Sequence, residues 1–157
     1  MIVHLQKSDM PDVLSVQREA YRPELLESAE TFERKLQLFP QGCFGCKEGD
    51  KLKAYVFTHP WISDVVAPLD CEQLTLPDSP DCLYIHDLAV RKSAQGSGIG
   101  GQLLDAVFAL ADERGYRNMA LVAVQDSEPY WQRRGFTPCE KLLYGGCVPA
   151  THMVLRR

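Results

Sequence analysis

Two spacings of apolar residues divide the first 60 residues of the chain. Apolar positions recur every three to four residues at 9–21 and 28–42, which predicts two amphipathic helices. Short apolar runs predict three strands, at residues 1–6, 43–48 and 51–59. Gly49 and Asp50 separate the last two runs, and this pair is typical of a β-hairpin turn.

Residues 60–81 follow neither spacing and contain four prolines. A loop of this length inside a compact domain usually has a function, so we expect a lid over a binding site.

After this loop the chain returns to the two spacings. The expected elements are strands at 82–90 and 119–124, a helix from Gly98 to Gly115, a short helix at 127–135, and an edge strand at 151–157. The unbroken apolar run at 119–124 predicts an interior strand that is covered on both faces. The order βααβββαβαβ(β) indicates a mixed α/β domain.

Length and charge narrow the class of protein. We expect a single domain over residues 1–157, which is long enough to bury a core. A formal net charge of −4 without a Lys/Arg cluster disfavours nucleic-acid binding. No apolar run approaches the roughly 18 to 20 residues of a membrane span, and the N-terminal residues do not resemble a signal peptide. We therefore expect a soluble, cytoplasmic protein with no membrane partner.

The six cysteines include one C-x-x-C pair, Cys43 and Cys46. This spacing occurs in zinc knuckles and redox motifs, but a tetrahedral zinc site needs four ligands and no second pair follows. In a reducing compartment the thiols are expected to be buried and structural, with no metal bound.

Four glycines fall within residues 96–101, between an expected strand and the long helix. The letters GSGIGG match the G-x-G-x-x-G of dinucleotide-binding folds, but five residues separate Val90 from Gly96, and the acidic residue on the next strand, Asp126, comes late. No Gly-Lys-Ser/Thr follows, which argues against a P-loop. A tight connection alone would need only one glycine. Small residues instead let backbone N–H groups converge on an anion at a helix N-terminus, which predicts a diphosphate site.

The run from Gln95 to Gly100 also fits (Arg/Gln)-x-x-Gly-x-(Gly/Ala), and here the sequence resembles the GNAT superfamily of acyl-CoA N-acyltransferases. The flanking strand ending in "LAV", the amphipathic helix, the buried strand and the short helix ending in Gly-Phe extend the resemblance over residues 82–137. It implies a mostly antiparallel mixed sheet of six to seven strands with about four helices, in which strands 4 and 5 splay apart.

The resemblance implies an acetyl-CoA-dependent N-acetyltransferase that transfers the acetyl group directly to a primary amine of a small molecule. The alternatives are transfer to a peptide or protein amine, or a non-catalytic module that senses acyl-CoA. Many relatives pair as dimers, so a homodimer is left open.

The family pattern also implies the coenzyme contacts. The backbone of strand 82–90 would bind the pantetheine arm, and the turn would bind the diphosphate. The N–H of Leu88 would also polarise the thioester carbonyl, where one such donor contributes roughly 3 kcal/mol. The coenzyme-binding residues expected from the pattern are Leu88, Ala89, Val90, Gln95, Gly96, Ser97, Gly98, Ile99, Gly100 and Gly101.

His86 is the expected general base. It precedes Leu88 by two residues, so strand alternation places it near the same face unless a bulge intervenes. Arylalkylamine N-acetyltransferases have a histidine at this place, and "HDLAV" is similar to their "HxLAV". Imidazole titrates in the useful pH range, although a structural histidine is the alternative. Asp87 is expected on the opposite face, in a structural role.

The general acid and the acceptor pocket have weaker signals. The family's usual tyrosine position holds Trp131, so its neighbour Tyr130 is the candidate acid, with core packing as the alternative. The loop between the first two helices could form an acidic mouth for a cationic amine, or could simply be solvated. The residues named for this pocket are Glu19, Glu24, Glu27 and Glu30, with Tyr21, Trp61 and Tyr84 as aromatic candidates.

Overall fold

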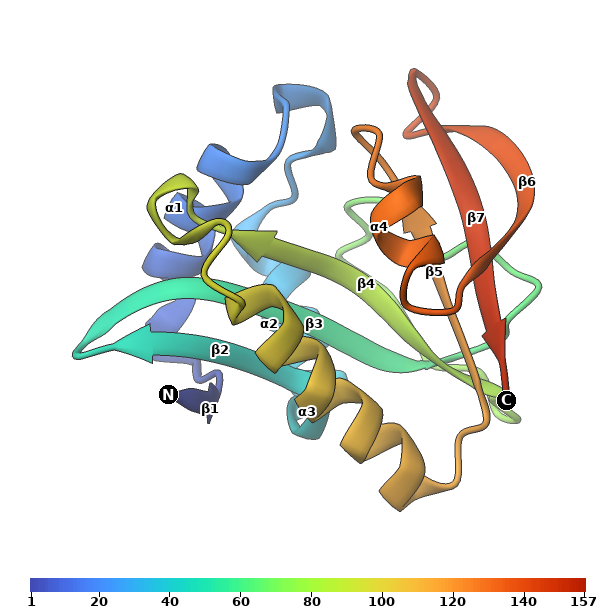
Figure 1. Ribbon diagram of the computed structural model, residues 1–157, viewed down its shortest axis with the longest axis horizontal. Helices are drawn as coiled ribbons and strands as arrows, with labels where there is room; N and C mark the ends of the chain where they lie inside the picture. The colour runs from blue at the N-terminus through green and yellow to red at the C-terminus, as the bar shows by residue number, and fades with distance from the viewer.

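The computed structural model describes residues 1–157, and its centre is one seven-stranded sheet (Figure 1). The strands are β1 (Ile2–His4), β2 (Cys43–Glu48), β3 (Lys51–Trp61), β4 (Cys82–Val90), β5 (Asn118–Ala123), β6 (Thr137–Tyr144) and β7 (Val148–Arg156). Their order is β1-β2-β3-β4-β5-β7-β6, and all neighbours are antiparallel except β4 and β5. The expected mixed, mostly antiparallel sheet is confirmed.

Four α-helices cover the two faces of this sheet: α1 (Met10–Ala20), α2 (Ala29–Leu38), α3 (Ile99–Arg114) and α4 (Glu128–Gln132). Short 3-10 helices add η1 (Lys7–Asp9), η2 (Pro23–Leu25), η3 (Pro40–Gly42) and η4 (Lys92–Ala94). Helices α1 and α2 pack on one face, and α3 and α4 pack on the other. In Figure 1 the long helix α3 crosses in front of the sheet.

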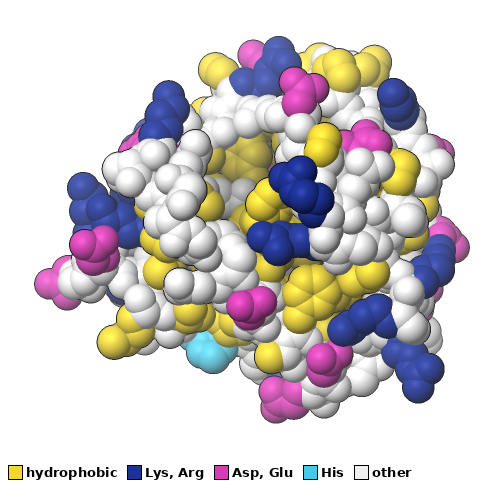
Figure 2. All heavy atoms as spheres, in the orientation of Figure 1, with side chains coloured by type: hydrophobic (Ala, Val, Ile, Leu, Met, Phe, Trp, Pro, Cys, Tyr) yellow, Lys and Arg dark blue, Asp and Glu magenta, His cyan; other side chains and the backbone are white.

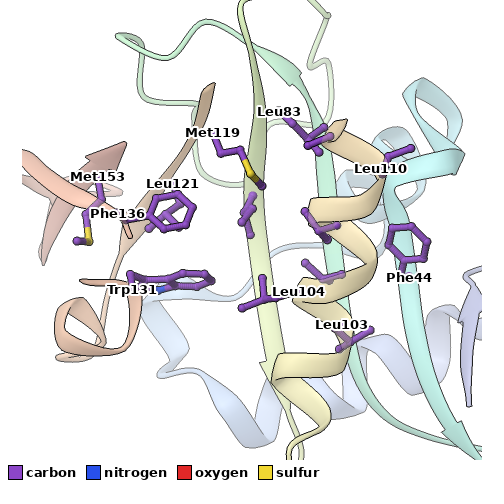
Figure 3. Close-up of a cluster of buried hydrophobic side chains, with 14 of the residues drawn as sticks. Phe44, Leu83, Leu103, Leu104, Leu110, Met119, Leu121, Trp131, Phe136 and Met153 are labelled. Atoms are coloured by element: carbon purple, nitrogen blue, oxygen red, sulfur yellow. The ribbon is translucent and has the colours of Figure 1, made fainter. Parts of the chain in front are cut away.

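The larger core lies between the sheet and helices α3 and α4 (Figure 3). Leu103, Leu104 and Val107 form the buried stripe of α3, as their spacing predicts. Trp131 and Phe136 are buried on the same face, beside strands β5 and β7. Burying a side chain of this size contributes roughly 1.5 to 3 kcal/mol. This core therefore holds α3, and with it the glycine-rich turn, at a defined height above the sheet.

The last strand differs from its prediction. The segment 151–157 was expected at the sheet edge, but β7 lies between β5 and β6, and the edge strand is β6. Met153 and Val154 of β7 are buried, whereas most of β6 is exposed. Strands β6 and β7 form a hairpin, and the more apolar of the two, β7, takes the interior position. There its side chains lose contact with water on both faces of the sheet, which is favourable for apolar residues.

Strands β4 and β5 separate partway along their length. They pair only from Cys82–Ile85 to Asn118–Leu121, although β4 continues to Val90. The divergence begins at His86, where the register between β3 and β4 shifts by one residue. Such a bulge bends and twists its strand. The splay of strands 4 and 5 that the family resemblance implied is therefore present.

The C-x-x-C pair lies on strand β2, with its two thiols on opposite faces of the sheet. Cys43 packs in the core under α1 and α2, and Cys46 packs in the core under α3. Burial raises the pKa of Cys43 to about 12, which keeps it as an unreactive thiol. The pair is therefore buried, as expected, whereas Cys139 and Cys147 are exposed, so the expectation of buried thiols is wrong for these two.

Among the helices, none has the length and apolar character needed to cross a bilayer. The side chains of His, Cys, Asp and Glu form no group of three or more that could hold a metal ion.

Candidate active site

The backbone of β4 faces the gap between β4 and β5 at two residues. In an antiparallel ladder, every second pair exchanges hydrogen bonds. The N–H of Arg91 donates to the carbonyl of Lys53 at 2.9 Å, which sets the phase of the ladder. By alternation, the N–H and C=O groups of Leu88 and Val90 point away from β3. The hydroxyl of Tyr21 donates to the Leu88 carbonyl at 2.7 Å, which agrees with this orientation.

The glycine-rich turn lies at the end of this gap. Gly96 and Gly98 have φ angles of 79° and 86°, in the left-handed region that favours glycine, and Gly98 is the N-cap residue of α3. A Cβ at either position would meet no atom within 4 Å. The space that side chains would fill is therefore open at the positive end of a 16-residue helix, where an anion is stabilised.

Together the gap and the turn line a cavity of about 600 Å³. Figure 2 shows a hollow near the centre of this face, with hydrophobic side chains on its floor and basic side chains at its edge. The expected residues from Leu88 to Val90 line the cavity, as do Gln95, Gly96 and the segment from Gly98 to Gly101. Ser97 is absent from the lining, and its hydroxyl instead donates to the Ala94 carbonyl within the turn.

Arg134 also lines this cavity, and sequence reasoning assigned it no role. Its Nη2 lies 3.5 Å from where a Cβ of Gly101 would be, and it donates to the hydroxyl of Tyr130 at 3.1 Å. Its Nε is buried and has no hydrogen-bond partner. A buried guanidinium N–H without an acceptor fits a site that binds an anion. The turn, the free N–H groups of β4 and this arginine therefore fit the diphosphate and the pantetheine arm of coenzyme A.

The model of the Acetyltransferase (GNAT) family matches residues 7–136, which is most of the chain. The chain belongs to this family. It is therefore an N-acetyltransferase that uses acetyl-CoA as cosubstrate. No curated protein matches the chain significantly in sequence.

Solved structures agree with the GNAT fold. A GNAT-like decarboxylase, GphF, in complex with isobutyryl-CoA has a TM-score of 0.82 at 14% identity, with 99% of this chain and 98% of the other covered. The ribosomal-protein-S18-alanine N-acetyltransferase from Escherichia coli has 0.72 at 18%, covering 99% and 92%. The PaiA N-acetyltransferase from Thermoplasma acidophilum, in complex with coenzyme A, has 0.73 at 14%, covering 100% and 98%. At these identities the similarity shows the fold alone.

In this GNAT domain, His86 is the extra residue of the β4 bulge. The bulge reverses the expected alternation. Leu88 packs toward α3, whereas His86 and Asp87 both lie on the face covered by α1 and α2. The expectation that His86 shares a face with Leu88 and opposes Asp87 is therefore wrong.

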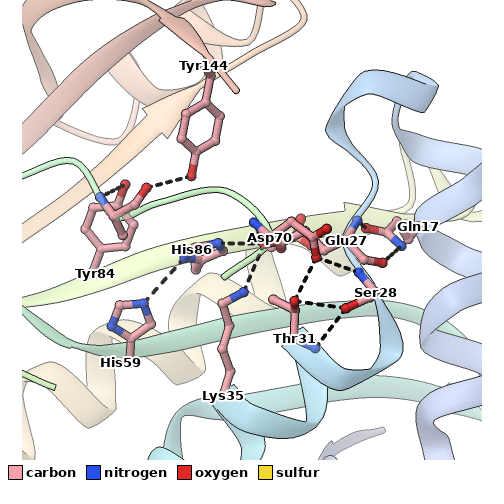
Figure 4. A network of polar contacts seen from close by, with 12 residues as sticks. Gln17, Glu27, Ser28, Thr31, Lys35, His59, Asp70, Tyr84, His86 and Tyr144 are labelled. Atoms are coloured by element: carbon pink, nitrogen blue, oxygen red, sulfur yellow. Dashed lines mark hydrogen bonds and ion pairs between the residues drawn. The ribbon is translucent and has the colours of Figure 1, made fainter. Parts of the chain in front are cut away.

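The His86 ring lies between two acceptors (Figure 4). Nε2 is 3.2 Å from Oε2 of Glu27, and Nδ1 is 3.4 Å from Nε2 of His59. His59 must carry its proton on Nδ1, since that atom lies 3.0 Å from the Pro60 carbonyl, which can only accept. Burial lowers the pKa of His59 to about 3, so its Nε2 is a bare acceptor at neutral pH.

In this arrangement the His86 ring can take up one further proton. A neutral His86 has a single N–H and can satisfy only one of its two neighbours, whereas the imidazolium satisfies both. Burial and the Lys35 ammonium, opposed by Glu27, lower the pKa of His86 below its ordinary value. The ring is therefore neutral at rest, and a proton taken up there completes a hydrogen-bonded chain from Glu27 to Pro60.

Glu27 is the buried carboxylate of the site, with its side chain 3% exposed. Its Oε2 accepts from Lys35 Nζ at 3.1 Å and from the Asp70 N–H at 2.8 Å, besides its contact with His86. Burial raises the pKa of Glu27, but the contacts with His86 and Lys35 outweigh this and leave it well below the ordinary value. Glu27 is therefore ionised and held in place by three groups.

The backbone of Glu27 is fixed by an amide on α1. Gln17 donates from Nε2 to the Glu27 carbonyl at 3.0 Å and accepts from its N–H at 2.7 Å. Gln17 belongs to the buried stripe of α1, where a polar residue needs a partner. A glutamine in an otherwise apolar helical stripe indicates a buried hydrogen-bond partner, but it does not say which residue of the following loop that partner is.

The other acidic residues of the loop lie elsewhere. Glu19 pairs with Arg91 at 2.7 Å, Glu24 pairs with Arg22 at the surface, and Glu30 is exposed. Of the four residues predicted to form an acidic mouth, only Glu27 is therefore buried at the site. Of the aromatic candidates, Tyr21 lines the large cavity, whereas Tyr84 is buried and stacks on His59, with Trp61 beside them.

Asp87 was expected to have a structural role, but it also lies at the wall of the large cavity. Its Oδ2 accepts from the buried Tyr55 hydroxyl at 2.7 Å. Burial and the nearby Glu27 charge raise the pKa of Asp87 to about 7. It therefore titrates near neutral pH, close to the splayed end of β4.

Tyr130 and Trp131 point in different directions from α4. Trp131 is buried in the core beneath α3, so it cannot replace the family's usual tyrosine. The Tyr130 hydroxyl lies 3.2 Å from where a Cβ of Gly100 would be and accepts a hydrogen bond from Arg134. Because that bond uses an oxygen lone pair, the hydroxyl proton stays free to be donated.

Proposed function

We propose that this enzyme transfers the acetyl group of acetyl-CoA directly to a primary amine of a small molecule. A second, small cavity beside His86 carries this proposal. It measures about 40 Å³ and shares Tyr21, His86, Asp87, Val122 and Val124 with the large coenzyme cavity. Leu25 of η2 and Leu69 of the 62–81 loop line it. A pocket of this small volume favours a small acceptor over a peptide, which would need a longer groove.

In this proposal the backbone of β4 binds the thioester and the pantetheine arm, and His86 at the bulge acts as the base. The N–H of Leu88 donates to the thioester oxygen, where negative charge develops, and Val90 holds the pantetheine arm. His86 takes a proton from the acceptor's ammonium group, because a proton there completes its hydrogen bonds. An alkylammonium is only about 0.1% neutral at pH 7, so such a base is needed.

Tyr130 is proposed as the acid for the departing thiolate. Tyr130→Phe is expected to lower kcat about tenfold, a modest effect because a coenzyme thiol with a pKa near that of cysteine leaves with little help. Steady-state kinetics with a saturating amine measures this. The matched control is Tyr116→Phe, outside both cavities. Equal rates for Tyr130→Phe and the wild type would make Tyr130 a packing residue.

Arg134 is proposed as a contact of the coenzyme phosphates. Arg134→Met is expected to raise the Kd for coenzyme A about tenfold, the effect of losing one charge-assisted hydrogen bond. Isothermal titration calorimetry measures this, and the exposed neighbour Arg133→Met is the control. Equal Kd shifts in both variants would mean that Arg134 acts only through general charge.

The two alternatives are separated by one assay. Acetyl-CoA is mixed with the protein, a thiol-reactive dye and panels of small amines and N-terminal peptides. Turnover restricted to peptides would favour a peptide acetyltransferase, and coenzyme binding without thiol release would favour a sensor.

The proposal also covers the domain organisation and the cellular location of the enzyme. We place one acetyltransferase domain over residues 1–157 in the cytoplasm, because six free cysteines suit a reducing compartment. Size-exclusion chromatography with light scattering tests for a homodimer.

A further inference from the structure

The small cavity has a marked charge asymmetry. Its lining contains no lysine or arginine, and its charged or titratable acids are Glu27 and Asp87. The remaining lining is His86 with apolar and tyrosine side chains, namely Tyr21, Leu25, Leu69, Val122, Val124 and Tyr144. A site of this composition favours a cation with an apolar body.

The two oxygens of Glu27 are used unequally. Oε2 accepts from Lys35 and from the Asp70 N–H and also contacts His86, whereas Oε1 makes no hydrogen bond. Oε1 is also not among the fully buried polar atoms that lack a partner. Because Glu27 lines the small cavity, this free oxygen is the one available to a molecule inside it.

We propose that Glu27 is the specificity-determining residue of the acceptor site, and that its Oε1 binds the ammonium group of an aliphatic primary amine. This rests on the proposed function, whose acceptor it defines. By the usual measure of roughly 10–15 Å³ per water, a volume near 40 Å³ accommodates the head group and a short unbranched stem. The rest of the amine extends toward the shared wall of the two cavities.

Asp87 is the competing anion, and its contacts make it the weaker one. Its Oδ2 is taken by the Tyr55 hydroxyl, and its raised pKa leaves a share of it uncharged at neutral pH. Glu27 keeps a full negative charge there. The other titratable groups around the carboxylate are Lys35 of α2, His59 of β3, His86 of β4, and Tyr21 and Tyr144 at the cavity wall.

Binding at Glu27 places the amine for transfer of the acetyl group, and the protons move as follows. The ammonium gives one proton to His86, and the neutral nitrogen then bonds to the acyl carbon. The C–S bond breaks with its electron pair on sulfur. The thiolate gains a proton from Tyr130 or water, and the second proton that the nitrogen loses passes through water to restore that donor. The products are the amide, the coenzyme thiol and one proton that leaves His86 for solvent.

Two variants with opposite expected effects test the role of the charge. Calorimetry is done on coenzyme A-saturated protein with n-alkylamines from methylamine to hexylamine, and with 1-butanol as an uncharged counterpart. Glu27→Gln is expected to raise the Kd and KM of the alkylamines about 30-fold and to leave the weak binding of 1-butanol unchanged. Lys35→Met, which removes the competing cation, is expected to leave alkylamine binding equal or tighter. Glu24→Gln, the same change on an exposed residue of this loop, is the matched control.

The double variant Glu27→Gln with Lys35→Met guards against a folding defect. It removes both charges of the buried pair, so it is expected to melt near the wild-type temperature while its alkylamine Kd stays about 30-fold raised. Kinetics supplies a second readout. With O-methylhydroxylamine, an amine that is uncharged at pH 7, Glu27→Gln is expected to leave KM unchanged.

The outcomes separate this inference from the proposed function. The inference is overturned if no alkylamine binds the wild type, if Glu27→Gln shifts charged and uncharged ligands alike, or if Lys35→Met weakens binding as Glu27→Gln does. Charge-dependent binding that Glu27→Gln removes, without any thiol release, would support the ammonium site and refute the transferase reaction.

Discussion

Gly98→Val is expected to abolish coenzyme A binding, with an affinity loss of at least about 100-fold. Gly98 is the N-cap of α3 with φ 86°, and the space beside it is open to the cavity. A β-branched side chain would fill the volume where the diphosphate meets the backbone N–H groups. Losing two charge-assisted hydrogen bonds there, at about 1.5 to 3 kcal/mol each, accounts for the magnitude.

Calorimetry with coenzyme A measures this effect, and the same helix supplies its control. Gly115 ends α3 with φ 78°, also with nothing within 4 Å of an added Cβ. Gly115→Val therefore introduces the same backbone strain far from the cavity, and it is expected to lower the melting temperature without changing the Kd. If Gly98→Val retained its affinity, the diphosphate could not lie on this turn.

His86→Ala is expected to lower kcat/KM by 100-fold or more near pH 6, the scale of a lost general base. The loss should shrink as pH rises. In the wild type, the base is neutral above a pKa that burial holds below the ordinary value of 6.5, so kcat/KM should level off above that pKa. In the variant only the free amine reacts, and the rate should climb tenfold per pH unit toward the amine's pKa near 10.

A pH–rate profile from pH 5 to 10 for both proteins checks the crossover. His86→Gln, which fills more of the space but accepts no proton at neutral pH, should follow the alanine variant. Parallel profiles for the wild type and both variants would assign His86 a structural role, and Asp87, with a pKa raised to about 7, would become the better candidate base.

Local signals along the chain were sufficient for most elements. The apolar stripe of α3, the glycine turn before it and the unbroken run of β5 each depend on neighbours within a few residues. These elements occur close to the predicted positions, at Ile99–Arg114 and Asn118–Ala123. The coenzyme contacts proposed for Leu88 and Val90 could also be named in advance, because they are backbone groups whose direction follows from strand pairing.

The proton-handling groups could not be found in the same way. The one-residue bulge at His86 moved that side chain to the other face of the sheet, and no local pattern marks a bulge. Glu27 looked like one of four similar acids, and only the packing of α1, α2 and the 62–81 loop buried it against Lys35 and His86. The position of Arg134 at the cavity depends on how α4 packs beside the first turn of α3, and no pattern within α4 predicts this.

The amino-acid sequence by itself determined the family, the glycine-rich turn before α3 and the residues of strand β4, because these depend on side-chain size and on periodicities shorter than one element. Only the tertiary structure decided which ionisable groups line the small cavity. The protonation and direction of Glu27, His86 and His59 depend on desolvation and on partners up to 59 positions apart, and both are set when distant segments pack together.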